Sequence, residues 1–425
     1  MHGDLWKRIA LTLAALFVVR LGTFIPLPGI NPEMWTRVFR QHEGTLLGSA
    51  NLLSGGGLRT LSILALTILP YVSVAVLVQL FMMVSQRLRA IADGGETGRR
   101  TIELYTRCGA VLLAAFQAYG IAVGLDGITG VVTYPSLVFR LSTVLTLTGG
   151  MLFLVWLAEQ ITARGIGNGI GLLLIASVLA EAPRNVVGSI EAAQVGILSQ
   201  EKLVGMALLA VAFTVVAVAV ERARRHVGLR FADRQVGDRH MGGQSVKLAF
   251  KLNPGGIVPP LVASWILLIV VIVAQIGARA AGQRGNGDWL AILVPSHPLH
   301  LALSGVIIIL FAFVYAAFLH DPERLARHLA THGGAVTELA PGTSTADYLD
   351  DTLSRVTALG AVYLVAIMLL PLALAEWLEL PFAVGGTWLL VLVCVTLDIE
   401  TQVRAYLPAA DVPQPDAPAA DVSTG

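Results

Sequence analysis

Ten apolar runs, most of them roughly 17–25 residues long, recur along this sequence. A helix of that length spans the hydrocarbon core of a bilayer, whereas the strands and helices of a soluble core are usually shorter. Only 13% of the 425 residues are charged, against about 25% in soluble domains. The sequence therefore predicts an all-α integral membrane protein with ten transmembrane helices. The predicted spans are 9–27, the run that ends at 79, 104–125, 141–158, 170–182, 203–220, 259–278, 299–319, 356–375 and 382–397.

The distribution of basic residues predicts the orientation of the chain. An even number of spans places both termini on one side of the membrane. The termini and loops of that side carry 18 Lys and Arg residues, and the loops of the opposite side carry 8. Because basic residues accumulate in cytoplasmic loops, we predict that both termini are cytoplasmic.

The stretch Asn51–Gln79 does not have the simple pattern of a span. It contains the triplet Gly55–Gly57, which destabilises a helix, and Pro70, which is expected to kink the run that follows. A half-helix that stops inside a membrane must line a cavity or be buried by protein, because lipid cannot satisfy its backbone groups. A loose segment beside a broken span suggests a pore.

Five polar residues fall inside or near the ends of predicted spans, where they are costly. Arg20, Gln275 and Asp398 lie near span ends. Their presence is explained if they form hydrogen bonds between helices or extend their side chains to the membrane interface. Gln79 and Gln117 lie deeper, in adjacent spans. Either a shared polar contact or separate interhelical hydrogen bonds would account for these two residues.

The sequence offers no equipment for covalent chemistry. It has no HExxH motif, no paired carboxylates within a span and no P-loop. We therefore expect neither enzyme activity nor a metal or cofactor, and the energy for any transport must come from a partner or a gradient.

Two segments outside the spans have a distinctive composition. The loop 221–253 is the most basic segment of the chain. It could serve only as an orientation signal, or it could dock an acidic protein surface or ribosomal RNA. The tail 403–425 ends in an acidic stretch rich in Pro and Ala, and we expect it to be disordered.

Seven stretches follow one another at the predicted span boundaries. They are RLGTFIPLPGINP (20–32), LLSGGGLRTLSILALTILPYVS (52–73), GETGRRTIELYTR (95–107), EQITARGIGNGI (159–170), VERARR (220–225), QSVKLAFKLNPGGIVPP (244–260) and PFAVGGTWLL (381–390). In this order, over nearly the whole chain, they resemble the SecY family, the pore subunits of the bacterial protein-conducting channel.

The resemblance implies a fold of two pseudo-symmetric five-helix halves around an hourglass pore. The halves would be 1–183 and 203–402, joined by a hinge loop at 184–202. The start of the plug helix would be 51–57, with Asn51, Leu53, Ser54, Gly55, Gly56 and Gly57 as its residues. The pore ring would comprise six aliphatic residues, which are Ile68, Val72, Ile170, Leu174, Leu261 and Val391. An aliphatic ring disfavours ions, because they would have to shed water there.

The resemblance also implies a lateral gate and a set of partners. The polar positions of the gate match Ser73, Gln79 and Gln117. The docking surface for the ATPase SecA or for the ribosome would include Arg222, Arg224, Arg225, Arg234 and Arg239. SecE and SecG subunits, preproteins with signal peptides and lipid are the other expected partners. The expected location is the bacterial plasma membrane.

This chain departs from the family pattern in the loops where the motor and the ribosome dock. Asp233 and Asp238 replace basic residues, and Ala340 replaces an arginine before Pro-Gly. A lysine pair is replaced by Ala330 and Thr331, and a basic tail by an acidic one. We therefore expect weakened docking of the standard motor.

Two alternatives to a general export channel remain. The departures are compatible with a specialised or accessory SecY protein with restricted clients. A secondary transporter with a broken-helix substrate site would need converging polar or charged groups at the midplane, whereas the predicted constriction is aliphatic.

Overall fold

The structure is a computed structural model of the 425-residue chain. It describes residues 2–41, 51, 54–134, 136–196, 198–231, 234–236, 239–241, 245–264, 266–267, 270, 297–319, 322–331, 334–336, 343–378 and 386–406. Within these ranges the helices are α1 (His2–Gly22), α2 (Pro32–Gln41), α4 (Leu69–Val84), α5 (Gln86–Ala92), α6 (Gly95–Asp126), α7 (Leu137–Arg164), α8 (Gly169–Gln194), α9 (Gln200–Arg222), α12 (Pro298–Leu319), α13 (Pro322–Thr331), α14 (Thr343–Trp377) and α15 (Gly386–Tyr406).

The chain forms two compact units. The first comprises Met1–Pro70, Val111–Glu181 and Val395–Gly425, and the second comprises Tyr71–Ala110 and Ala182–Cys394. Four helices therefore begin in one unit and end in the other. The predicted division into halves at 1–183 and 203–402 is a different one, and it stays a prediction. The helices α8 and α9 extend into the predicted hinge and leave residues 195–199 between them.

Seven helices of the described residues are long and apolar enough to cross a membrane, and they contain the predicted spans three to six, eight and nine and residues 386–397 of the tenth. The predicted second span corresponds to α4, and α5, which lies beyond the predicted end at residue 79, forms a bent pair with α4 at an angle of 111°. The first span is α1, which carries three basic residues. The seventh span begins as a helix at Val258 and continues outside the described residues. These elements agree with the ten predicted spans.

Pro70 lies in the first turn of a helix instead of kinking one, so the expected kink is wrong. It is the second residue of α4, where its missing N–H group would have had no intrahelical partner. Thr67 precedes the helix with a left-handed backbone at φ 58°, and its side-chain oxygen accepts a hydrogen bond from the Leu69 amide at 3.2 Å. The expected long apolar span is therefore shortened, and residues 58–66 form turns.

In the first unit, α1 packs against α7. The start of α7 is capped by Ser136, whose hydroxyl accepts a hydrogen bond from the Phe139 amide. The part of α6 within this unit buries Ala114, Ala118 and Ala122 completely on one face. Small residues at a spacing of four let neighbouring helices approach closely. Such close packing matters in a membrane, because lipid tails are as apolar as the side chains and hydrophobic burial does not drive the helices together.

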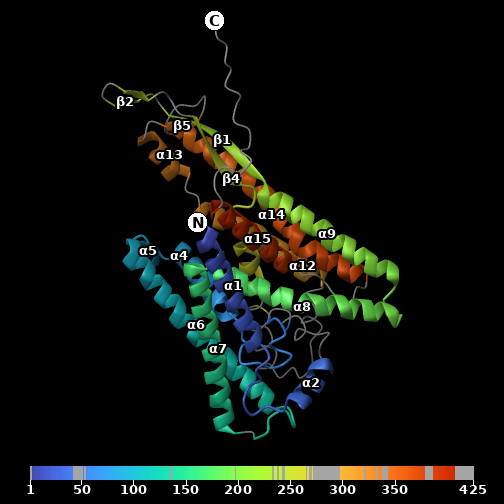
Figure 1. Ribbon diagram of the computed structural model, residues 1–425. Coiled ribbons are helices and arrows are strands. Elements are labelled where there is room, and N and C mark those ends of the chain that lie inside the picture. Colours follow the sequence, from blue (N-terminus) through green and yellow to red (C-terminus); the bar gives the residue numbers. More distant parts are fainter. Residues whose placement is uncertain are drawn as a thin grey trace. The chain divides into compact units, whose positions relative to one another are not determined.

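In the second unit, α12 and α14 run side by side, as Figure 1 shows in orange. The buried face of α12 carries small residues such as Gly305 and Ala312. A Cβ atom at Gly305 would lie 3.3 Å from a methyl carbon of Leu369 on α14. The close approach of these helices therefore depends on small residues at their interface.

The second unit also contains strands, which the sequence analysis did not predict. They are β1 (Arg224–Phe231), β2 (Arg234–Val236), β3 (Arg239–Met241), β4 (Ser245–Lys251) and β5 (Gly334–Val336). The strands β2 and β3 pair as an antiparallel hairpin, and a second sheet has the order β4-β1-β5, also antiparallel. The two loops predicted at 221–253 and 320–354 are thereby joined, because β5 belongs to the second of them (Figure 1).

An apolar core lies beneath the three-stranded sheet. It consists of Val227, Leu229, Phe250, Ala326, Leu329, Val336, Leu349 and Leu353. The strands contribute alternate residues, as the period of a half-buried strand requires, and α13 and the first turns of α14 contribute the rest. We call β1, β4, β5, α13 and the start of α14 the sheet domain.

Candidate channel site

The glycine triplet forms a tight turn within the first unit, and we call residues 51–57 the plug segment. The Asn51 carbonyl accepts hydrogen bonds from the amides of Ser54 and Gly56, each at 3.1 Å. Gly55 and Gly56 have φ angles of 58° and 87°, in the left-handed region that favours glycine. The predicted break in the helix is confirmed. Leu53 lies outside the described residues.

Two charged side chains from different helices meet the plug segment. Arg20, from α1, donates a hydrogen bond from Nη1 to the Gly55 carbonyl at 2.8 Å. Its guanidinium also lies over the Phe24 ring, 4.8 Å from the centroid. Glu181, from α8, is only 7% exposed, and its Oε2 accepts a hydrogen bond from the Asn51 amide group at 3.4 Å. The triplet is thus enclosed by groups of opposite charge.

The close fit of the triplet explains the need for glycine. A Cβ atom on Gly56 would collide with Glu181 Oε1 and would lie 3.9 Å from Arg20 Nη1. A Cβ atom on Gly55 would lie 2.9 Å from the Cα atom of Ser177, which belongs to the rigid backbone of α8. A side chain at Gly55 would push the plug segment away from α8, and one at Gly56 would displace either the Glu181 carboxylate or the plug segment.

The chain that follows the plug segment is held by the connection between α1 and α2. Trp35 Nε1 donates a hydrogen bond to the Leu58 carbonyl at 3.0 Å, and the Thr60 hydroxyl donates to the Thr23 carbonyl at 2.7 Å. An isolated β-bridge pairs Pro26 with Ser62. Its two hydrogen bonds run from the Leu27 amide to the Leu61 carbonyl at 2.9 Å and from the Ile63 amide to the Ile25 carbonyl at 3.0 Å.

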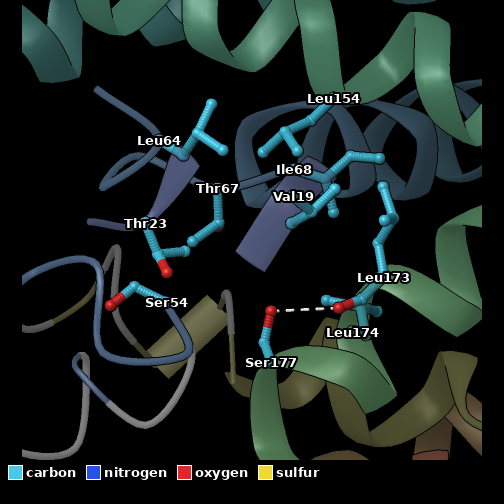
Figure 2. Close-up of a pocket in the computed structure, with 10 residues that line it drawn as sticks. All are labelled: Val19, Thr23, Ser54, Leu64, Thr67, Ile68, Leu154, Leu173, Leu174 and Ser177. Atoms are coloured by element: carbon cyan, nitrogen blue, oxygen red, sulfur yellow. Dashed lines mark hydrogen bonds between the residues drawn. The ribbon is translucent and has the colours of Figure 1, made fainter. Parts of the chain in front are cut away.

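A cavity of about 20 Å³ lies beside the plug segment, enough for roughly one water molecule. Figure 2 shows its lining, which combines aliphatic side chains with the hydroxyl-bearing residues Thr23, Ser54, Thr67 and Ser177. The aliphatic residues are Val19, Leu64, Ile68, Leu154, Leu173 and Leu174. The lining contains Ser54 of the plug segment and two of the six predicted ring residues, Ile68 and Leu174.

The other four predicted ring residues do not line this cavity. Ile170 is half-buried in the first turn of α8, in the same unit. Val72 and Leu261 are half-buried and Val391 is buried, and these three belong to the second unit. The convergence of all six on one constriction stays a prediction.

The predicted gate residues lie on two helices. Ser73 is buried in α4, and Gln79, further along the same helix, is half-buried. The Oε1 atom of Gln79 is buried and has no hydrogen-bond partner within the described residues. Gln117 is half-buried in α6. Their role in a lateral gate stays a prediction.

The predicted docking arginines lie around the strands. Arg222 is the last residue of α9, Arg224 and Arg225 open β1, and Arg234 and Arg239 lie on β2 and β3. Because Val227 and Leu229 are buried, the alternate residues of β1 and their partners on β4 face outward. The exposed basic residues on this outer face are Arg224, Arg230, Lys247 and Lys251. We call these four residues the basic face.

Most departures in the docking loops lie outside the described residues. This applies to Asp233, Asp238 and Ala340 and to the tail from residue 407. Ala330 and Thr331 are the last two residues of α13.

The sequence matches a family model described as SecY over residues 62–400. The protein translocase subunit SecY of Pseudomonas aeruginosa is 39% identical over 405 residues, which are 95% of this chain and 91% of the relative. The SecY subunit of Escherichia coli K12 is 38% identical over 408 residues, 95% of this chain and 92% of the relative. The chain belongs to the SecY family of protein-conducting channels.

Solved channel structures share the fold of this SecY protein. A structure described as a protein-conducting channel matches with a TM-score of 0.64 at 15% identity, covering 94% of this chain and 92% of its own. Sec61 in a canine ribosome–channel complex matches with a TM-score of 0.62 at 14% identity, again covering 94% and 92%. The membrane-spanning fold predicted from the sequence is confirmed.

Glu181 is the functional candidate that sequence reasoning missed. It lies at the end of the predicted span 170–182, two residues before Pro183, where an acidic residue is usually taken as the start of a loop. The structure instead continues α8 to Gln194 and buries the carboxylate. The signal available in the sequence was an acidic residue at the end of an apolar run.

Proposed function

We propose that this SecY protein passes unfolded secretory polypeptides across the bacterial plasma membrane and releases apolar segments sideways into the bilayer. The observation that carries the proposal in this chain is the plug segment, packed against a cavity that Ile68 and Leu174 line. A cavity that holds about one water molecule cannot pass hydrated ions. We therefore infer that the plug segment seals this cavity and is the part that moves when a polypeptide enters.

The backbone of the plug segment suits a reversible seal. The described residues of the segment, 51 and 54–57, contact α1 and α8 through hydrogen bonds to Arg20 and Glu181 and a close approach to Ser177. Interactions of this kind are individually modest and can be remade in another position. An extensive apolar interface would instead hold the plug segment permanently.

The pore supplies a path, and other proteins supply the energy. We infer that SecE clamps the channel, that SecG associates with it, and that SecA or the ribosome docks on the cytoplasmic side. The basic face supports this inference, since Arg224 lies directly opposite Lys251 in the strand register. Like charges at directly opposite positions repel each other, and an anionic partner would relieve this repulsion.

Deletion of residues 51–57 tests the plug. The deleted channel, reconstituted with its SecE subunit in planar bilayers, should conduct ions at rest while it still exports preproteins. Substitution of the exposed Leu359 by Ala on α14 gives a control that leaves the plug segment intact. Unchanged resting conductance after the deletion would contradict the plug assignment.

The docking loops favour a second candidate, an accessory channel with restricted clients. Asp233, Asp238 and Ala340 remove positive charge from these loops, and several such losses together weaken electrostatic steering. SecA from a standard system should bind this channel weakly. The triple change Asp233→Lys, Asp238→Arg and Ala340→Arg should strengthen that binding most at low salt. Equal affinity of both channels at low salt would leave the general export channel as the better description.

A further inference from the structure

We propose that Arg20 and Glu181 form a charged latch that holds the plug segment closed. This inference rests on the proposed function, because it assigns two positioning residues to the plug. The two side chains come from α1 and α8 and meet the plug segment at adjacent residues, Gly55 and Gly56. Both residues act on the plug through its backbone and the Asn51 side chain, and neither belongs to the predicted ring.

The burial of Glu181 is the first observation that supports a latch. The residue is 7% exposed, on a helix of membrane-spanning length. A buried carboxylate persists only where other groups stabilise its charge. Part of that stabilisation is visible in the plug segment, where the Asn51 amide group donates to Glu181 Oε2 at 3.4 Å. When the plug segment leaves, Glu181 loses this partner.

The arrangement around Gly56 is the second observation. A Cβ atom added to Gly56 would collide with Glu181 Oε1, and it would lie 3.9 Å from Arg20 Nη1. Both charged groups therefore lie close to Gly56. Opposite charges that lie close to the same residue in a poorly hydrated site attract each other, so the charge of Arg20 helps to keep Glu181 beside the closed plug, and the charge of Glu181 helps to keep Arg20 there.

The placement on α8 is the third observation. Ser177 and Glu181 are four residues apart, so they lie on one face of the helix, one turn apart. Ser177 fits against Gly55 and Glu181 against Gly56. One turn of α8 therefore provides both the shape that receives the two glycines and the charge that holds them. The entry of water and a polypeptide would hydrate both charged groups and weaken the latch.

The latch predicts a specific pattern of ion leak. In planar bilayers, with the complete channel complex, Glu181→Gln and Arg20→Gln should each raise the resting open probability about tenfold, the loss expected for one charge-assisted hydrogen bond. The double variant should leak little more than the stronger single variant, because the two groups act on one another. Arg20→Lys keeps the charge and should restore part of the seal. Glu191→Gln, at an exposed acidic position on the same helix, is the matched control.

A second measurement does not depend on conductance. With Cys108 and Cys394 replaced by Ser, the pair Ser54→Cys and Ser177→Cys places two thiols at the cavity that both residues line. Disulfide formation reports how often the plug segment lies against α8. Its rate should fall in the Glu181→Gln channel and stay unchanged in the Glu191→Gln channel.

The outcomes separate the latch from the plug itself. If deletion of 51–57 leaks while the Arg20 and Glu181 variants seal and crosslink as the parent does, the latch is wrong and the plug stands. If the deletion does not leak, the plug assignment is wrong. Additive effects of the two single variants would show independent roles and would also overturn the latch.

Discussion

The plug segment and the sheet domain are both irregular insertions between membrane helices, but different forces hold them. The sheet domain has an apolar core in which residues such as Leu229 and Leu349 are almost completely buried. The described residues of the plug segment are held by hydrogen bonds to the backbone and by close approach at glycines. Burial of apolar area stabilises one arrangement over all others, whereas polar contacts to a backbone can be exchanged for water or for other partners.

The difference suggests separate roles for the two regions. A docking surface must keep its shape while a large partner binds and leaves, and the sheet domain has the core for that. A seal must leave its site and return, and the described residues of the plug segment, 51 and 54–57, are held by hydrogen bonds and close approach. Substitutions in the sheet domain should therefore affect stability and docking, and those around the plug segment should affect ion leak.

The largest expected effect is the loss of core packing in the sheet domain. Leu349 is 1% exposed, and Leu349→Ala should destabilise the domain by about 2–5 kcal/mol, because a buried leucine leaves a cavity. Amide hydrogen exchange in β1 and β4 would measure this loss. Leu359→Ala, at a position 61% exposed on the same helix, is the control. If Leu349→Ala raised the resting conductance but changed hydrogen exchange in the sheet domain little, the proposed difference between the sheet domain and the plug segment would be wrong.

A smaller loss of stability is expected when Gly56 of the plug segment is replaced by alanine. Gly56 has φ 87°, and an L-residue in the left-handed region costs about 1–2 kcal/mol. Gly56→Ala also collides with Glu181, so the resting conductance should rise while hydrogen exchange in the sheet domain stays unchanged. Gly205→Ala is a suitable control, since its added Cβ atom meets no atom within 4 Å. Gly56→Ala channels that seal like the parent would contradict the close fit.

The smallest effect should come from the contact between α2 and the chain after the plug segment. Trp35→Phe removes the donor to the Leu58 carbonyl, and a typical hydrogen bond contributes about 0.5–1.5 kcal/mol. A slight increase in resting conductance is expected, below that of Gly56→Ala. Trp6→Phe, at a residue 68% exposed, should have no effect on leak. A larger leak from Trp35→Phe than from Gly56→Ala would reverse the order of these two contacts.

The sequence predicted those parts of the fold in which a single local pattern, such as a long apolar run, is enough to determine the secondary structure. The run that becomes α12 is apolar over its whole length, and no alternative to a span fits it. The strands were missed although VGLRF and SVKLAFK alternate apolar and polar residues, because the basic charge of the loop suggested only a surface. Pro70 was misjudged because the start of a helix depends on the turn before it.

The candidate site was only partly predictable, for a related reason. The glycines signalled a break, and that break is present. The contact between Glu181 and Gly56 joins residues 125 positions apart, and no local pattern encodes it. Arg20 was expected to hydrogen-bond between helices or to reach the interface, whereas it donates to the Gly55 carbonyl.

The β-bridge between Pro26 and Ser62 limits how far the plug segment can travel. Gly57 is five residues from the bridge, and an extended chain covers about 3.3–3.6 Å per residue, so Gly57 can move within a radius of about 17 Å while the bridge holds. If the bridge opened, the chain would be anchored at the start of α4, twelve residues away, and the radius would grow to about 40 Å. A pair of backbone hydrogen bonds outside the seal thus defines two ranges of displacement, a short excursion and a long one.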